Sequence, residues 1–127
     1  MYSTNYLGHA LRAASIGKDE LVFIHSGVGQ DLVTYGDFFA NCEKLANALV
    51  AAGVQPGDRV AAQIAKTVVG LELYFATVLA GGVFLPLNTA YTVAELEYFI
   101  ADAQPSVLVC DPSRKQVLQA LVDTTET

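Results

Sequence analysis

The chain has 127 residues, a length typical of one compact domain and sufficient to bury a hydrophobic core. Hydrophobic residues make up 53% of it and the mean hydropathy is +0.39, which excludes a disordered chain. Seven basic against thirteen acidic side chains give a net charge of −6, with no basic cluster. This charge makes nucleic acids and anionic membranes poor partners.

Residues 68–87 are the one strongly apolar stretch as long as a membrane span. Glu72 lies inside this stretch, a glycine pair interrupts it and Pro86 ends it, so we expect no membrane-spanning helix there. The amino terminus, MYSTNYLGHALRAAS, lacks a basic start followed by an apolar core. We therefore expect no secretory signal and a cytoplasmic location.

The two cysteines favour free thiols. Cys42 falls on the apolar side of a predicted helix and Cys110 at the end of an apolar strand, so we expect both to be buried. Two distant cysteines with the well-separated His9 and His25 supply no metal site.

The amino-terminal third predicts a helix at 6–14 and a β-hairpin. The hairpin strands are LVFIH, residues 21–25, and DLVTY, residues 31–35, joined by the glycine-containing SGVGQ. Gly27 and Gly29 lack the third glycine and the following helix of a dinucleotide loop, so we interpret them as turn residues. His25 and Ser26 have no nucleophile elbow or orienting acid, and we assign them to the hairpin as well.

An amphipathic helix follows the hairpin. Thr34 and Asp37 have capping-box spacing, Gly53 ends the helix, and Pro56 with Gly57 fits a type II turn. Its apolar residues recur at helical spacing: Phe38, Cys42, Leu45 and Leu49.

The remainder alternates between strands and helices, which predicts right-handed crossovers and a parallel sheet. Glu72 and Thr77 alone interrupt the apolar helix at 68–79, so we expect that helix to be buried from several directions. The predicted strands are 59–64, 83–88 and 106–110, and the predicted helices are 68–79, one capped by Thr92, and Pro112–Val122.

Local signals mark the last two helices. Thr92 and Glu95 have capping-box spacing, and Tyr91 with Leu96 has the spacing of a hydrophobic staple. Asp111 before Pro112 predicts the cap of the last helix. The expected buried side of the helix after Thr92 is Val93, Leu96, Phe99 and Ile100.

Polar residues follow three strands at one predicted edge of the sheet, where ligands bind in open α/β sheets. Structural interpretations compete: Thr67 caps a helix, Asn88 forms an Asx turn, and Asp111 is a cap. The candidates are Lys66 and Thr67, then Asn88, Thr89 and Tyr91, then Asp111. A receiver-type regulator would need an acidic pair after the first strand, where His25 and Ser26 stand, and an aspartate at the end of a middle strand, where Asn88 stands. A standalone α/β module that binds a small molecule or regulates a partner remains an alternative.

Several motifs resemble the adenylate-forming superfamily of acyl-CoA synthetases and related enzymes. They are VTYGDF at 33–38, VQPGDRVA at 54–61 and LAGGVFLPLN at 79–88, in the family's order. The stretch LPLNTAYTVAELEYFIADAQPSVLVCDPS is most similar to the malonyl-CoA synthetases. The resemblance implies that residues 1–127 are an amino-terminal fragment of the large domain, with a hairpin and first helix at 21–53 and a βαβαβα unit at 59–122.

The resemblance also implies a reaction. A small carboxylic acid, malonate, attacks ATP with Mg²⁺ present to give an acyl-adenylate and pyrophosphate, and CoA then displaces AMP. The family's phosphate loop, adenosine site and mobile lid have no matching positions in this chain. The resemblance therefore implies no catalytic residue and no metal site here. The chain alone is expected to be inactive, to bind no cofactor and to self-associate through uncovered sheet surface.

The resemblance implies that the strand and helix around this joint are scaffold, and one site is predicted there from position alone. Asn88, Thr89 and Tyr91 stand at a strand end and are predicted to form part of the wall of the acyl or pantetheine channel.

Overall fold

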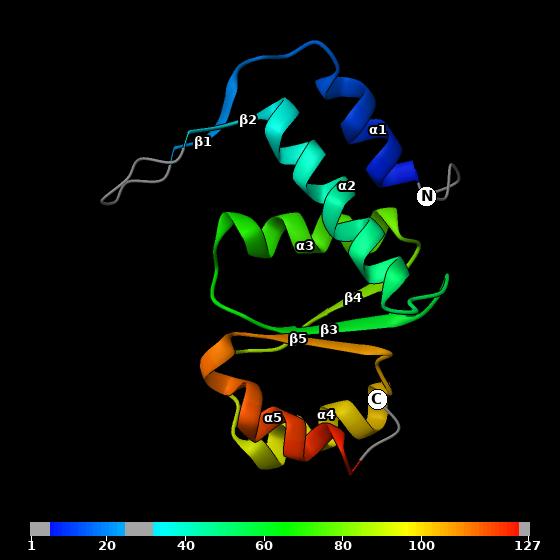
Figure 1. Ribbon diagram of the computed structural model, residues 1–127, viewed down its shortest axis with the longest axis vertical. Helices are drawn as coiled ribbons and strands as arrows, with labels where there is room; N and C mark the ends of the chain where they lie inside the picture. Colours follow the sequence, from blue (N-terminus) through cyan, green and yellow to red (C-terminus); the bar gives the residue numbers. More distant parts are fainter. Residues whose placement is uncertain (1–5, 25–31, 125–127) are drawn as a thin grey trace.

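The computed structural model describes residues 6–24 and 32–124, which form a layered α/β structure (Figure 1). A parallel three-stranded sheet lies at its centre, with strand order β4-β3-β5. Its strands are β3 (Arg59–Gln63), β4 (Val83–Pro86) and β5 (Val107–Cys110). The predicted fold, a mainly parallel sheet with flanking helices preceded by an antiparallel strand pair, is confirmed.

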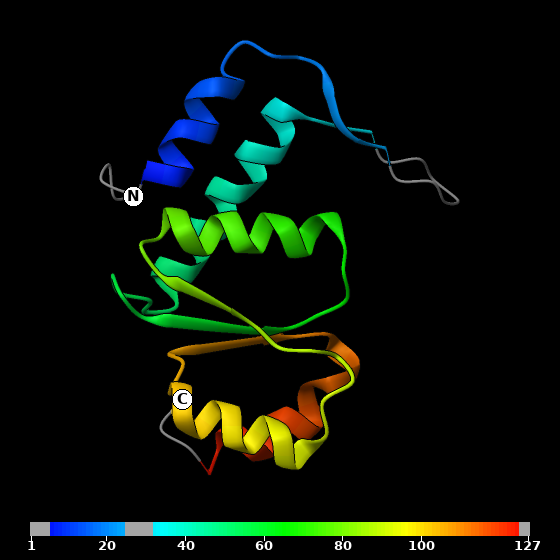
Figure 2. The ribbon, with the colours of Figure 1, turned by 180° about the vertical axis from the view of Figure 1, so that it is seen from behind.

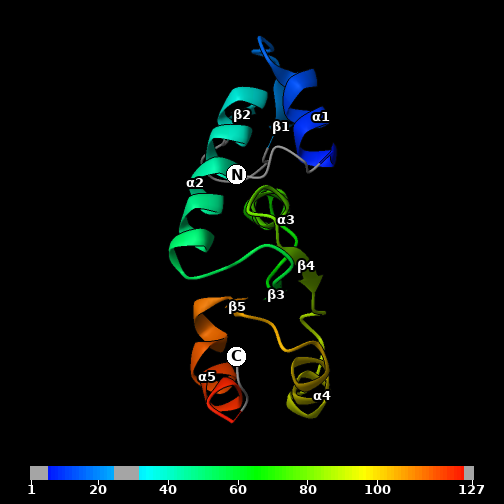
Figure 3. The same cartoon turned by 90° about the vertical axis from the view of Figure 1, so that its right-hand side faces the viewer.

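Helices cover both faces of the sheet, as the views from behind and from the side show (Figures 2 and 3). One face carries α1 (Tyr6–Ser15), α2 (Tyr35–Ala51) and α3 (Val68–Leu79), and the other carries α4 (Val93–Ala103) and α5 (Lys115–Val122). Each side has its own hydrophobic core, one between the sheet and α2–α3 and one between the sheet and α4–α5.

The antiparallel pair consists of β1 (Leu21–Ile24) and β2 (Leu32–Thr34). The second strand is shorter than predicted, because Tyr35 begins α2. The Thr34 side chain accepts a hydrogen bond from the main-chain N–H of Asp37 at 3.1 Å and caps the helix there. The hairpin assignments of His25, Ser26 and the nearby glycines lie outside the described residues.

Helix α3 buries its two polar side chains. Glu72 is 5% exposed and accepts a hydrogen bond from the Asn41 amide of α2 at 3.0 Å. Thr77 is fully buried, and its hydroxyl donates to the carbonyl of Leu73 at 2.9 Å. Val69 in the first turn departs from this pattern, since it is 61% exposed.

Gly82, the second residue of the glycine pair, lets α3 approach the sheet closely. A methyl group at Gly82 would lie 3.1 Å from the side chain of Thr77 and 3.2 Å from the carbonyl oxygen of Asp58. The predicted turn before β3 is also present, since Gly57 has φ of 88° and the Asp58 N–H donates to the carbonyl of Gln55 at 3.0 Å.

The capping box of α4 is confirmed, whereas one residue of its predicted buried side is wrong. The Thr92 hydroxyl accepts from the Glu95 N–H, and the Glu95 carboxylate accepts from the Thr92 N–H. Val93 is 47% exposed. The ring of Tyr91 closes that end of the core instead, stacking on Phe99 at 5.0 Å.

The predicted cap of the last helix is also wrong. The Asp111 side chain makes no capping hydrogen bond. Instead, the main-chain carbonyl of Asp111 accepts a hydrogen bond from the Arg114 N–H at 2.9 Å. This bond closes a 3₁₀ turn, η1 (Pro112–Arg114), so that α5 begins at Lys115 rather than Pro112.

The long apolar stretch divides between two elements. Residues 68–87 form α3, a glycine turn and β4. Across 6–24 and 32–124, the structure holds no helix with the length and hydrophobicity that crossing a membrane requires.

Candidate functional site

A groove of about 950 Å³ runs between α3 and the carboxyl ends of β3 and β4. Because β3 and β4 are parallel neighbours, the residues that follow them meet at one edge of the sheet, as predicted. The residues that line it are Ala62, Ile64, Ala65, Lys66, Thr67, Val68, Gly70, Leu71, Tyr74, Phe84, Pro86, Leu87, Asn88 and Thr89.

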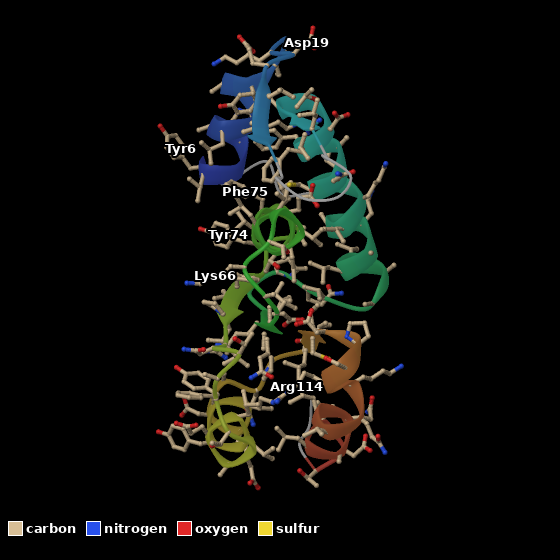
Figure 4. The ribbon with its side chains drawn as sticks, turned by 90° about the vertical axis from the view of Figure 1, so that its left-hand side faces the viewer. Tyr6, Asp19, Lys66, Tyr74, Phe75 and Arg114 are labelled. Atoms are coloured by element: carbon tan, nitrogen blue, oxygen red, sulfur yellow. The ribbon has the colours of Figure 1, made fainter. Side chains whose placement is uncertain are left out.

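The polar end of the groove lies at the start of α3. Thr67 caps this helix, because its hydroxyl accepts a hydrogen bond from the Gly70 N–H at 3.1 Å. Lys66 is exposed beside the cap, and Figure 4 shows its side chain and that of Tyr74 pointing to the same side of the molecule. The ammonium group therefore stands at the rim of the groove.

Two aromatic rings form the apolar wall. Tyr74 of α3 meets Phe84 of β4 edge to face, with ring centres 5.3 Å apart. Tyr74 also contacts Phe75, which joins the core between the sheet and α2–α3. The wall is therefore anchored to packed residues on both sides, which is typical of a preformed binding surface.

Asn88 shapes the joint after β4. Its side-chain oxygen accepts from the Ala90 N–H at 2.9 Å, the Asx turn that was one interpretation of this residue. Its carbonyl accepts a hydrogen bond from the Gln63 amide at 2.9 Å. The joint therefore has a fixed conformation, and it places Asn88 and the exposed Thr89 along the groove.

The other two predicted candidates lie elsewhere. Tyr91 is half-buried against Phe99 and does not line the groove. Asp111 follows β5, on the opposite side of β3 from β4. The structure thus brings together Lys66, Thr67, Asn88 and Thr89, and it separates Tyr91 and Asp111 from them.

The groove can bind, but its described lining offers little for bond-making chemistry. The polar side chains of this lining are those of one lysine, two threonines, one tyrosine and one asparagine, and the lining contains no carboxylate, histidine or cysteine. Elsewhere in ranges 6–24 and 32–124, no group of three or more His, Cys, Asp or Glu residues is placed to hold a metal ion.

Sequence reasoning missed two residues that define this site. Gln63 is 1% exposed and orients the joint through Asn88. Its signal was a single amide among the apolar residues that follow Arg59 in the strand RVAAQI. Tyr74 was counted as part of an apolar helix, and pattern alone did not indicate which side of that helix faces the groove.

Comparison with known proteins identifies the family. Residues 10–127 match the family model described as AMP-binding enzyme. The feruloyl-CoA synthase of Amycolatopsis sp. is 42% identical over 111 residues, which cover 87% of this chain and 22% of that protein. The long-chain-fatty-acid–CoA ligase of Bacillus subtilis is 38% identical over 77 residues, covering 61% of this chain and 14% of that protein.

Solved structures agree. Apo MatB from Rhodopseudomonas palustris superposes with a TM-score of 0.87 at 45% identity, over 94% of this chain and 23% of that chain. The ATP-bound form of the same protein gives the same values. The matched region thus spans about a quarter or less of the length of these relatives. It belongs to the AMP-binding enzyme family and corresponds to an amino-terminal part of the adenylate-forming acyl-CoA synthetases.

Proposed function

We propose that this chain is the amino-terminal scaffold of an acid–CoA ligase of malonyl-CoA synthetase type. The observation that carries the proposal is the 45% identity to MatB, a malonyl-CoA synthetase, at a TM-score of 0.87 over 94% of the chain. In the complete enzyme, malonate, ATP and CoA would give malonyl-CoA, AMP and pyrophosphate. Such an enzyme would act in the cytoplasm, where its two nucleotide substrates are available.

The groove does not fit ATP with Mg²⁺. Magnesium takes oxygen ligands, mainly carboxylates and phosphates, and the described lining carries no carboxylate and a single cation, Lys66. We therefore assign no adenylation step to these residues and expect the chain alone to be inactive. The groups that bind ATP, Mg²⁺ and CoA would lie in other parts of the ligase.

The groove fits a different role, as part of the wall of the acyl or pantetheine channel. The aromatic wall of the groove and its hydroxyl and amide groups suit a pantetheine arm, which is largely apolar and carries a few amide groups. Asn88 and Thr89 would contact the substrate directly. Tyr91, which was predicted with them, would support the joint from behind through its stacking on Phe99.

The first test of the ligase assignment is the intact mass of the native gene product, followed by an assay of that product. We expect a protein several times heavier than the 13.5 kDa of this chain that forms a CoA thioester with malonate faster than with ferulate. A native product of 13.5 kDa without thioester formation would refute the assignment and favour the standalone binding module. Faster turnover of ferulate would redirect it to the feruloyl-CoA synthases.

The channel role is tested by substitution in the complete enzyme. Thr89→Val removes a hydroxyl at nearly constant volume, and we expect it to raise the KM for CoA or for the acid about fivefold. Asn88→Asp keeps the oxygen that accepts from Ala90 while it places a charge at the groove. Tyr91→Phe is the control, because the ring that stacks on Phe99 stays. Unchanged kinetic constants in both groove variants would contradict the role.

A further inference from the structure

Two side chains at one end of the sheet enclose polar atoms that have no hydrogen-bond partner. Among the residues that the structure describes, these atoms are the amide oxygen Oε1 of Gln63 and the guanidinium nitrogens Nε and Nη2 of Arg114. Buried polar groups in native proteins are nearly always hydrogen-bonded, so each exception needs a physical explanation. The groove does not provide one, because neither residue belongs to its lining.

The strand register places the two residues near each other. Gln63 ends β3 and lies opposite Cys110, the last residue of β5. Alternation along β3 directs Gln63 to the same side of the sheet as Ala61, which belongs to the core between the sheet and α4–α5. Arg114 follows shortly after Cys110, in η1, and Figure 4 shows its side chain between α4 and α5. The unpaired atoms therefore lie at the same end and on the same side of the sheet.

The guanidinium group of Arg114 has the features of an anion site. Its Nε and Nη2 form one edge of the guanidinium plane, the edge that donates two parallel hydrogen bonds to a carboxylate or phosphate. Within the described ranges Arg114 forms no ion pair, whereas Arg12 of α1 pairs with Glu43 of α2. An enclosed charge without a counter-ion is strongly destabilising. Because Arg114 as a whole is only half-buried, a small ion can reach it from solvent.

We propose that Arg114 and Gln63 together bind a small oxyanion that carries a hydroxyl group, of which inorganic phosphate is the simplest example. Two phosphate oxygens accept hydrogen bonds from Nε and Nη2 of Arg114, and the phosphate O–H donates to Oε1 of Gln63. One ligand then satisfies all three unpaired atoms. A dicarboxylate such as malonate has no O–H at pH 7 and leaves Oε1 unpaired. The site does not depend on the reaction proposed above.

One amide group couples this oxyanion site to the groove. The amide nitrogen of Gln63 donates to the carbonyl of Asn88 at 2.9 Å, and the side chain of Asn88 accepts from the Ala90 N–H at 2.9 Å. A ligand on the oxygen of the same amide polarises and fixes it, which strengthens the bond to Asn88. Phosphate therefore stabilises the joint that lines the groove, although it binds on the other side of the sheet.

The test is a titration of the ¹⁵N-labelled 127-residue chain with inorganic phosphate at constant ionic strength and pH 7, followed by NMR. We expect the Nε–H of Arg114, the side-chain amide of Gln63 and the main-chain N–H of Ala90 to shift along one common binding curve. The Nε–H of Arg12, which pairs with Glu43, is the internal reference and should not shift. Sulfate has the same shape without an O–H, and it should bind about tenfold more weakly.

Matched variants separate the oxyanion site from a general salt effect. Arg114→Lys keeps the charge but loses the two-pronged donor, and it should weaken phosphate binding about tenfold or more. Arg12→Lys makes the same change at an ion pair across the sheet and should leave the affinity within about twofold. Gln63→Leu should abolish the preference for phosphate over sulfate. Thermal melting in phosphate-free buffer, followed by circular dichroism, verifies that each variant is folded.

Three results would overturn the inference. An equal rise in melting temperature with phosphate for the unsubstituted chain and Arg114→Lys, without a shift at the Arg114 Nε–H, would mean that phosphate acts only through exclusion from the surface and that water hydrates the site. Equal affinities for phosphate and sulfate would mean that Gln63 takes no part. Tighter binding of malonate than of phosphate would give the guanidinium to a carboxylate instead.

Discussion

The side chain of Gln63 ties the end of β3 to the joint that follows β4. Its amide nitrogen donates a hydrogen bond to the carbonyl of Asn88 at 2.9 Å, and the side chain is 1% exposed. Its amide oxygen is buried and has no protein partner among the described residues. One buried amide thus holds the position of the groove-lining Asn88 and Thr89.

Substitutions at Gln63 should separate the hydrogen bond from the burial. Gln63→Leu removes the bond to Asn88 together with the unpaired oxygen, and we expect it to lower the free energy of unfolding by about 1 kcal/mol. Gln63→Glu keeps the shape but places an ionised carboxylate, which cannot donate, against the Asn88 carbonyl. It should lower the free energy by about 3 kcal/mol or more at pH 7, measured by urea unfolding.

The pH dependence of Gln63→Glu provides an independent check. Burial should raise the folded-state pKa of the introduced carboxyl above its unfolded value of about 4.3. A raised pKa means that the folded state binds the proton more tightly, so the stability lost at neutral pH should be regained progressively as the pH falls. The free energy of unfolding of Gln63→Glu is compared with that of the unsubstituted chain at each pH. A difference that stays constant from pH 7 to pH 5 would show that the carboxyl is solvated.

The close approach of α3 and β4 depends on Gly82. Gly82→Ala would place a methyl group 3.2 Å from the carbonyl oxygen of Asp58, a main-chain atom next to β3. We expect a loss of about 1–3 kcal/mol in unfolding free energy. Gly36→Ala in α2 is the matched control: its new methyl group would meet the side chain of Thr34 at an ordinary 3.7 Å. That helical position should be neutral or gain up to about 1 kcal/mol.

Equal losses for the two glycine substitutions would contradict this steric explanation. Reduced backbone freedom in the unfolded chain, which both substitutions share, favours the folded state and cannot account for such losses.

Local signals predicted the fold, because each element carries its own start, period and end. Thr92 and Glu95 predicted the start of α4, and the alternation of strands and helices predicted the parallel sheet. The start of α5 was wrong because a 3₁₀ turn and a capped helix begin with the same Asp–Pro pair at Asp111 and Pro112. That difference lies in main-chain hydrogen bonding, which side-chain patterns do not specify.

The site was less predictable than the fold. The residues after the strands could be predicted as site candidates, because the topology of a parallel sheet places its strand ends at one edge. The separation of Asn88 from Tyr91 could not be foreseen, since it depends on an Asx turn that redirects the chain and on the stacking of Tyr91 against Phe99. Gln63 was missed because its role is a contact with Asn88, 25 positions away in the sequence.

The two cysteines should differ in reactivity. Cys42 is completely buried, and burial, followed by the nearby Glu72 carboxylate, raises the pKa of its thiol to about 12. Both thiols are free, as predicted. Cys110 is only half-buried, so the expectation that both cysteines are buried is wrong for Cys110. Iodoacetamide at pH 8 should alkylate Cys110 in the folded protein and reach Cys42 only after unfolding, because the thiolate is the nucleophile.

Mass spectrometry of peptides taken at successive times measures both labelling rates. Cys110→Ser is the control that leaves one thiol, and its folded form should label at the slow rate. Labelling of Cys42 as fast as Cys110 in the folded protein would mean that α2 opens away from α3 on the time scale of the experiment.

The capping box of α4 should make the chain sensitive to acid. Hydrogen bonds from the main chain and then the hydroxyl of Thr92 lower the folded-state pKa of Glu95 below its ordinary value of 4.5. The ionised carboxylate therefore stabilises the folded state above about pH 4.5, and this contribution is lost as the pH falls through the lower folded-state pKa. Glu95→Ala should melt below the unsubstituted chain at pH 7, with the difference shrinking below pH 4. Thr92→Ala removes the hydroxyl that accepts from the Glu95 N–H, and should lower the unfolding free energy by about 1 kcal/mol at pH 7. A melting difference for Glu95→Ala that does not change between pH 7 and pH 3 would assign the loss to helix packing instead of the ionised cap.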